Sequence, residues 1–220
     1  MGIQLSYSAL SIFRDCKLCF YNDRIKKLSR PRGIFSSLPN GIDGLLKKKL
    51  EAYRGSLPPA LDVPELQGFQ LYDGFDLAKM RNWKTNPLKM QDTKGNIIVG
   101  AFDDLLFNPK TEEYAFLDYK TKGKEPDQAY CEQYYQTQLN IYTRFLEIGG
   151  RKVAKFGVLL YFWPVESETG LLDFKSKPFF LTPNTSDAEK LFREAITCLE
   201  GPMPEPSSDC EYCDFISKRI

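Results

Sequence analysis

Two apolar segments in the middle of the chain are interrupted by acidic and basic residues. Residues 97–107 are rich in β-branched and aromatic side chains but contain Asp103, and residues 114–121 contain Asp118 and Lys120. Both compositions favour strands, and the Asn-Pro-Lys-Thr sequence between them favours a tight turn. Because alternate residues of a strand share a face, Asp118 and Lys120 point the same way, and a hairpin would bring Asp103 beside them. Such charges need a partner. A divalent cation held by the two carboxylates, with the lysine facing an anionic substrate, would supply one.

The order of these residues resembles a nuclease motif. The segment Gly-Ala-Phe-Asp that ends at Asp103, followed by Asp118-Tyr119-Lys120, is similar to the core motif of the PD-(D/E)xK nuclease superfamily, with Phe102 where the nominal motif has proline. The resemblance implies an α/β fold of the restriction-endonuclease type, with a central mixed sheet flanked by helices. It also implies a metal-dependent DNA nuclease that hydrolyses phosphodiester bonds. Asp103, Asp118 and the main-chain carbonyl of Tyr119 would bind Mg²⁺ or Mn²⁺, and Lys120 would orient or deprotonate the attacking water.

A helix predicted over residues 128–148 carries Gln138 and Tyr142. Their spacing resembles the Gln-x-x-x-Tyr sequence of the RecB-like and CRISPR-associated exonuclease branches, which act in processes such as DNA repair. The resemblance therefore favours an exonuclease in which both side chains complete the pocket. Gln138 interrupts an otherwise apolar helix face, so its amide needs hydrogen-bond partners. It either positions the attacking water or a phosphate, or satisfies a main-chain group in the core.

A third acid on the metal is usual in this superfamily, and Asp43 lies at the corresponding place in the chain order. An aspartate oxygen could bind Mg²⁺ or Mn²⁺ there. The alternative is that Asp43 caps the helix predicted over residues 42–53, since aspartate is favoured at helix N-termini. Asp104 is another carboxylate, but strand geometry places it on the opposite face from Asp103.

Four of the six cysteines form two Cys-x-x-Cys pairs, one near each end of the sequence. The pairs are Cys16 with Cys19 and Cys210 with Cys213. Such pairs are typical of metal sites, because each can clamp one edge of a tetrahedron or cluster. Related nucleases hold a [4Fe-4S] cluster with one N-terminal and three C-terminal cysteines, whereas here the division is two and two. The resemblance favours a [4Fe-4S] cluster, a structural Zn²⁺ ion bound by the four cysteines is the alternative, and a disulfide is disfavoured in a reducing compartment.

Positive charge is concentrated near the start of the chain. The formal net charge is only +1, but residues 14–54 contain eleven Lys or Arg against four Asp or Glu. A basic region beside an acidic metal centre would suit a nucleic-acid backbone, and Arg30, Arg32, Lys47 and Lys48 are the candidate contacts. The alternative is an ordinary solvated helical surface.

The elements that must position these residues follow from apolar periodicity. Helices are predicted after Ser6 and over residues 42–53, 128–148 and 186–199, and strands over residues 88–91, 153–165 and 171–181 in addition to the central pair. Residues 36–41 read as a loop. We expect residues 1–220 to form one domain, with a core over residues 39–201 and ends at residues 1–25 and 202–220 clamped by the cysteines.

Absences in the sequence exclude other classes. The chain contains no histidine, which removes Ser-His and Cys-His catalysis and every histidine-containing zinc site. No apolar run could span a membrane and no signal peptide is evident, so we expect a soluble, cytoplasmic protein. The expected partner is DNA, as a single strand or a strand end, and a helicase or other DNA-processing protein would be a separate chain. The competing hypothesis is a catalytically degenerate module that binds nucleic acid or assembles into a DNA-processing complex.

Overall fold

The fold is known from a computed structural model, in which residues 2–31, 33, 37–168 and 170–217 are described. The strands are β1 (Gln4–Ser6), β2 (Gln70–Leu71), β3 (Met90–Gln91), β4 (Ile97–Val99), β5 (Asp104–Asn108), β6 (Glu113–Thr121), β7 (Lys152–Val153), β8 (Gly157–Glu166) and β9 (Leu172–Leu181). The α-helices are α1 (Tyr7–Asp15), α2 (Lys17–Tyr21), α3 (Ser37–Leu50), α4 (Leu77–Met80), α5 (Gln128–Ile148), α6 (Thr185–Glu200) and α7 (Glu211–Ser217). Shorter helical turns are η1 (Asn22–Lys26), η2 (Glu51–Tyr53), η3 (Pro59–Leu61) and η4 (Pro64–Leu66).

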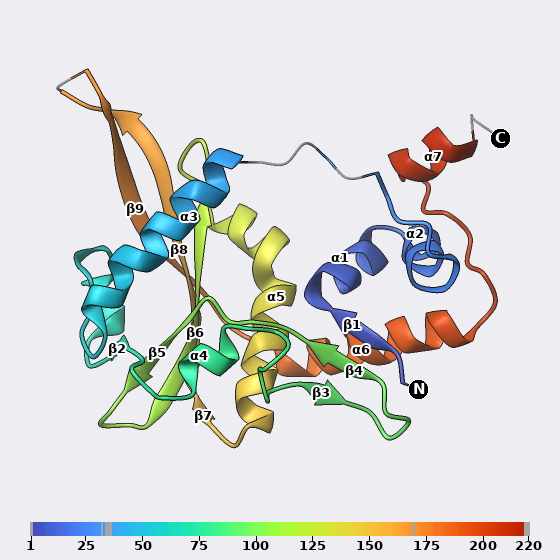
Figure 1. Ribbon diagram of the computed structural model, residues 1–220, viewed down its shortest axis with the longest axis horizontal. Coiled ribbons are helices and arrows are strands. Elements are labelled where there is room, and N and C mark those ends of the chain that lie inside the picture. Colours follow the sequence, from blue (N-terminus) through green and yellow to red (C-terminus); the bar gives the residue numbers. More distant parts are fainter. Residues whose placement is uncertain (1, 32, 34–36, 169, 218–220) are drawn as a thin grey trace.

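The larger sheet places β6 at its centre. Its strand order is β2-β5-β6-β8-β9, and β7 pairs with the start of β6. β6 is antiparallel to β5 and parallel to β8, so the sheet is mixed, as predicted. The hairpin of β8 and β9 extends beyond the body of the molecule (Figure 1).

Consecutive residues on the central strands point to opposite faces of this sheet. On β6, Phe116 belongs to the core that contains residues of α5, whereas Leu117 belongs to a second core on the other face. Asp104 is the partner of Leu117 across the β5–β6 ladder and therefore shares the second face. Asp118 lies two residues after Phe116 and therefore faces α5.

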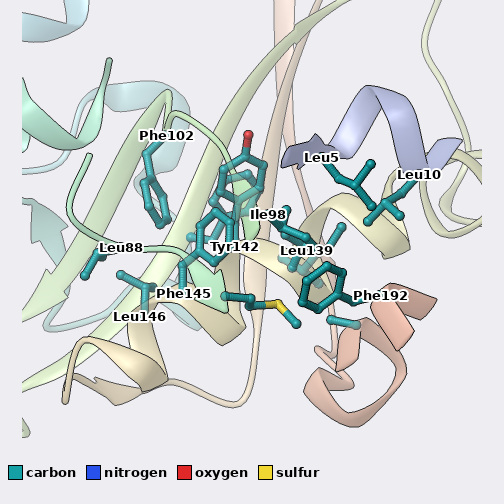
Figure 2. Packing of buried hydrophobic residues seen from close by; sticks show 14 of the residues in the cluster. Leu5, Leu10, Leu88, Ile98, Phe102, Leu139, Tyr142, Phe145, Leu146 and Phe192 are labelled. Carbon is teal, nitrogen blue, oxygen red and sulfur yellow. The ribbon is translucent and has the colours of Figure 1, made fainter. Parts of the chain in front are cut away.

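Helix α5 crosses the middle of the molecule beside the sheet (Figure 1). It packs against β6, β8 and β9, and also against α1 and α6. Its buried side chains include Leu139, Tyr142 and Phe145, which pack with Ile98 and Phe102 in one cluster (Figure 2). The helix begins after Asp127, whose carboxylate accepts a hydrogen bond from the main-chain N–H of Tyr130, so its predicted position is confirmed.

The single strand predicted over residues 97–107 is wrong. The segment divides into β4, in a small sheet of order β1-β4-β3, and β5, in the larger sheet. Between them the chain passes close to α5 at Gly100, where an added Cβ would lie 2.7 Å from the Tyr142 ring. Only glycine permits this approach, and the chain changes sheets there.

The predicted loop over residues 36–41 is also wrong, because α3 begins at Ser37. Pro39 falls in the first turn of α3, where its missing N–H costs no helical hydrogen bond. On the side of the molecule opposite the β8–β9 hairpin, α2 packs against α7, so two helices near opposite ends of the sequence lie side by side (Figure 1).

Candidate active site

Four of the predicted site residues meet on the face of the sheet that α5 covers. The main-chain N–H of Tyr119 donates a hydrogen bond of 3.3 Å to Oδ2 of Asp103, which holds that carboxylate beside β6. Asp118 accepts a hydrogen bond of 3.2 Å at Oδ1 from Nε2 of Gln138, and its Oδ2 contacts the ammonium of Lys120. The described hydrogen bond of Gln138 therefore goes to a carboxylate rather than to a main-chain group.

The two carboxylates and the lysine influence one another strongly. Asp118 is only 2% exposed. Burial raises the pKa of Asp118, and although Lys120 opposes the rise, the negative charge of Asp103 adds to it. Burial alone would lower the pKa of Lys120, but Asp118 and Asp103 outweigh it and raise that pKa. The centre thus holds two carboxylates and one ammonium in a largely dry environment.

The donor set of this centre fits a hard divalent cation. Oδ2 of Asp118 is buried and has no hydrogen-bond donor with good geometry in the described part of the chain, although the Lys120 ammonium lies against it. Carboxylate and carbonyl oxygens are the ligands that Mg²⁺ and Mn²⁺ prefer. Asp103 is partly exposed, with 24% of its side chain accessible, so an ion could reach the pair from solvent.

Asp43 lies near this centre but is separated from it by Lys47. The Lys47 ammonium is 2.9 Å from Oδ2 of Asp43 and 2.8 Å from Oδ1 of Asp103. The alternative role of Asp43 as a helix cap is wrong, because α3 begins six residues earlier at Ser37. A cationic group therefore already bridges the two aspartates, as a metal ion would.

Tyr142 closes another side of the site. Its hydroxyl accepts a hydrogen bond of 3.3 Å from the main-chain N–H of Ala101, and its ring stacks parallel to that of Phe116 at 5.1 Å between centroids. Burial is the main reason why the pKa of Tyr142 rises to about 12, so the phenol stays neutral at physiological pH. Tyr142 thereby fixes the backbone just before Asp103.

A second charged cluster lies on the opposite face of the sheet. Asp104 is fully buried and accepts hydrogen bonds from both terminal nitrogens of Arg54, at 2.7 and 2.5 Å. Arg81 donates to it at 2.9 Å, the Tyr119 hydroxyl at 2.6 Å and the main-chain N–H of Leu105 at 2.8 Å. The Tyr119 side chain thus serves this cluster, whereas the prediction concerned its main-chain carbonyl.

Arg54 and Arg81 were not predicted from the sequence as partners of a buried carboxylate. Glu51 accepts from both guanidinium groups, at 2.7 and 2.6 Å, and so connects the cluster to η2. Nε of Arg81 also donates to the main-chain carbonyl of Asp103 at 2.9 Å. The one available signal was Asp104 itself, since a carboxylate inside an apolar strand requires a cationic partner.

The predicted nucleic-acid contacts are in different environments. Lys48 is exposed on α3, whereas Lys47 is engaged with the aspartates. Arg30 pairs with Asp15 at 3.1 Å and lies near Sγ of Cys210, so it belongs to the cysteine region. Arg32 lies outside the described residues.

The four predicted cysteines come together where the chain ends meet. Their sulfur atoms all lie within 4.8 Å of one another, an arrangement that could hold a metal. Cys16 is 3.6 Å from Cys213, and Cys19 is 3.5 Å from both Cys210 and Cys213. All six cysteines of the chain are free thiols, and the other two, Cys131 and Cys198, lie on helices α5 and α6.

Comparison with known proteins identifies the family of the chain. The family model of the PD-(D/E)XK nuclease superfamily matches residues 43–217, which include Asp103, Asp118 and Lys120. The match covers most of the chain, and the protein belongs to this superfamily. A comparison with curated proteins gave no match. In the described part of the chain, no helix is both long enough and apolar enough to cross a membrane.

Proposed function

We propose that this protein is a metal-dependent deoxyribonuclease that hydrolyses phosphodiester bonds, in the manner of the RecB-like exonucleases. One observation carries the proposal: Asp118 is buried and incompletely hydrogen-bonded beside Asp103, Lys120 and Gln138. Charged groups buried for stability are normally saturated with partners, whereas those kept for chemistry retain free capacity.

Asp103, Asp118 and the main-chain carbonyl of Tyr119 are the proposed ligands of Mg²⁺ or Mn²⁺, with Asp43 available if Lys47 moves aside. The ion would neutralise charge that develops on the phosphate during hydrolysis. The Lys120 ammonium lies beside Asp118 and would orient the attacking water and pair with a phosphate oxygen. Gln138 would hold the Asp118 carboxylate in the orientation that the ion requires.

Cleavage of DNA by the purified chain tests this proposal. Single-stranded and double-stranded DNA, labelled at either end, would be incubated with Mn²⁺ or Mg²⁺ and with EDTA. We expect metal-dependent cleavage that falls by about 10² to 10⁴-fold in Lys120→Ala. Lys152→Ala is the matched control, because Lys152 is an exposed lysine on β7, beside the other end of β6. Cleavage that survives Lys120→Ala would contradict the assignment of Lys120.

The second candidate is a non-catalytic module that binds nucleic acid. The position of Lys47 favours it, since an ammonium group already occupies the space between Asp43 and Asp103. This candidate predicts DNA binding that is unaffected by Asp118→Ala, and no cleavage with any divalent metal. The nuclease proposal predicts cleavage that Asp118→Ala abolishes.

For the cysteine site we propose a structural metal, with one Zn²⁺ ion favoured over a [4Fe-4S] cluster. Four thiolates at about 2.3 Å from one zinc ion lie roughly 3.8 Å apart in a tetrahedron. The distances of 3.5 and 3.6 Å between these sulfurs are close to that spacing, whereas a cluster of several irons needs a wider opening. Anaerobically purified protein should be colourless with one zinc per chain. A brown protein with iron and sulfide would establish the cluster instead.

A further inference from the structure

Trp83 is a large aromatic side chain that remains half exposed close to the candidate active site. It lies in the loop between α4 and β3 and is 49% exposed, whereas the other tryptophan, Trp163, is buried on β8. Leaving so much apolar surface in water gives up stabilisation that burial would provide. A single exposed aromatic is common on protein surfaces, so its surroundings decide whether it has a role.

The loop that carries Trp83 is held firmly against the segment that leads to Asp103. The carbonyl of Met80 accepts a hydrogen bond of 3.0 Å from the N–H of Phe102. The Asn86 side chain donates to the carbonyl of Gly100 at 2.9 Å. With the bond from Arg81 to the carbonyl of Asp103, three hydrogen bonds fix both sides of the Trp83 turn. An aromatic side chain on a rigid backbone segment loses little conformational entropy when it binds a ligand.

Trp83 lines a pocket of about 510 Å³ that reaches the candidate active site. Gln138 and Tyr142 line the same pocket, and Gln138 is hydrogen-bonded to Asp118. Its volume is in the range of sites that hold small molecules. One ligand could therefore contact Trp83 with one of its groups and the carboxylates with another.

The remaining walls of the pocket combine positive charge with aromatic surface. Arg24 lines it and is paired with Asp23 at 2.7 Å, and Tyr7 lines it from the start of α1. Lys84 does not line the pocket, but its ammonium lies 5.6 Å from the centroid of the Trp83 ring. Aromatic rings bind nucleobases by stacking and basic groups bind phosphates, so the combination suits one nucleotide of a single strand. A base that remains paired and stacked in a duplex presents no free face to the ring.

We propose that this pocket receives an unpaired nucleotide of the DNA strand, with its base stacked on Trp83 and its phosphate near Arg24. The proposal deepens the proposed nuclease function and rests on it for the identity of the ligand. It makes single-stranded DNA, or the frayed end of a duplex, the form that enters the site. Trp83 is then a specificity-determining residue, because it selects unpaired over paired nucleotides.

Intrinsic tryptophan fluorescence tests the proposal directly. The full chain carrying Lys120→Ala, which is expected to leave DNA uncut, would be titrated with the single strand dT₁₀ and with a relaxed, covalently closed circular duplex, which has no end to fray. We expect dT₁₀ to quench the fluorescence, Trp83→Phe to abolish the quenching, and Trp163→Phe to retain it. Equal quenching by the closed circular duplex, or loss of quenching in Trp163→Phe alone, would overturn the proposal.

Affinity measured by anisotropy of a labelled dT₁₀ provides the second readout. Trp83→Ala should weaken binding about tenfold, with a smaller loss for Trp83→Phe, which keeps a stacking surface. A single abasic nucleotide moved along the strand should reproduce that loss at one position. At that position Trp83→Ala should cause no further loss, because the two changes remove the same contact. Equal affinities of the parent and Trp83→Ala would overturn the proposal.

Failure of the pocket assignment can be distinguished from failure of the nuclease function. If the wild-type chain cleaves a single strand but neither quenching nor an effect of Trp83→Ala is seen, the pocket assignment is wrong and the nuclease function stands. If quenching and the abasic coupling are seen but the wild-type chain never cleaves, the pocket assignment stands and the nuclease function is wrong.

Discussion

Asp103 and Asp104 are neighbours in the chain, yet the sheet gives them opposite environments. Asp104 is buried on one face and receives five hydrogen bonds, from Arg54, Arg81, Tyr119 and Leu105. Asp103 lies on the other face beside Asp118. Asp103 accepts hydrogen bonds from the N–H of Tyr119 and from Lys47, and Asp118 contacts Lys120. Asp104 is the first residue of β5 and Asp103 directly precedes this strand, so their consecutive side chains point to opposite faces of the sheet.

The difference separates a carboxylate with a structural role, Asp104, from one that we propose to be a metal ligand, Asp103. A buried charge is tolerated when ion pairs and hydrogen bonds compensate for its lost hydration. The Asp104 cluster meets that condition, and its contacts connect η2, the end of α4, β5 and β6. The pair on the α5 face meets it only in part, which leaves capacity for a cation and a phosphate. The saturated cluster also fixes the Asp103 backbone through Arg81. The following changes act on one face at a time.

The largest expected effect is on the α5 face. Asp118→Asn should reduce metal-dependent cleavage on the order of a thousandfold, because it removes a proposed metal ligand that is buried and nearly isosteric with its replacement. The free energy of unfolding should change by less than about 1 kcal/mol, because the Lys120 ammonium still has the negative charge of Asp103 close by when Asp118 is neutralised. Steady-state kinetics and urea unfolding measure the two quantities. A large loss of stability would contradict the contrast between the faces.

The reciprocal change is on the other face. Asp104→Asn should lower the free energy of unfolding by about 3 kcal/mol, because Arg54 and Arg81 would lose a fully buried partner. Cleavage per folded molecule should fall by less than about tenfold, since Asp104 touches neither metal nor substrate in the proposed mechanism. Urea unfolding and cleavage assays at low temperature check these outcomes. A thousandfold loss of activity in fully folded protein would contradict the division of roles.

A smaller effect is expected from the lysine that bridges Asp43 and Asp103. Lys47→Met removes a positive charge 2.8 Å from Asp103, so the metal concentration for half-maximal cleavage should fall roughly threefold. The shift should shrink in high salt, because Lys47 is partly exposed. Lys49→Met is the control, because Lys49 is an exposed lysine on the same helix, and it should leave the midpoint unchanged. An increase in the midpoint for Lys47→Met would show that Lys47 assists metal binding.

The smallest effect concerns acid stability at the edge of the saturated cluster. Hydrogen bonding to Arg54 is the main reason why the pKa of Glu51 is lowered to about 2, with Arg81 contributing. A lowered carboxyl pKa stabilises the fold above the unfolded-state pKa of about 4.3, and this stabilisation is lost as the pH falls towards 2. Glu51 is 46% exposed, so the contribution should be below about 1 kcal/mol. Glu51→Gln should therefore be less stable than wild type at pH 6, and the difference should disappear near pH 2.

The sequence predicted the strand and the helix that carry the site residues better than the course of the segments that connect them. The spacing of Asp118 and Lys120 on one strand, and of Gln138 and Tyr142 on one helix, follows from fixed periods of 2 and 3.6 residues. The structure agrees with the positions of β6 and α5. The sequence also predicted that the two cysteine pairs lie together, because two Cys-x-x-Cys pairs are typical of one four-thiolate metal site.

The features that were mispredicted depend on long-range contacts. The change of sheet at Gly100 results from the approach of Tyr142, which lies 42 residues further along the chain. Two partners of Asp104 are Arg54, which directly follows the helix predicted over residues 42–53, and Arg81, which lies in a segment to which periodicity assigned no element. The start of α3 was missed because Pro39 and two glycines favour a loop locally, whereas the apolar side of α3 packs against β6.

Direct measurement of Mn²⁺ binding tests the central claim, that the α5 face holds the metal and the opposite face does not. Electron paramagnetic resonance of free Mn²⁺ during titration would give the affinity for wild type, Asp118→Asn and Asp104→Asn, each kept fully folded at low temperature. We predict that Asp118→Asn abolishes the binding seen in wild type and that Asp104→Asn retains it. Binding that is unchanged in Asp118→Asn would contradict the account.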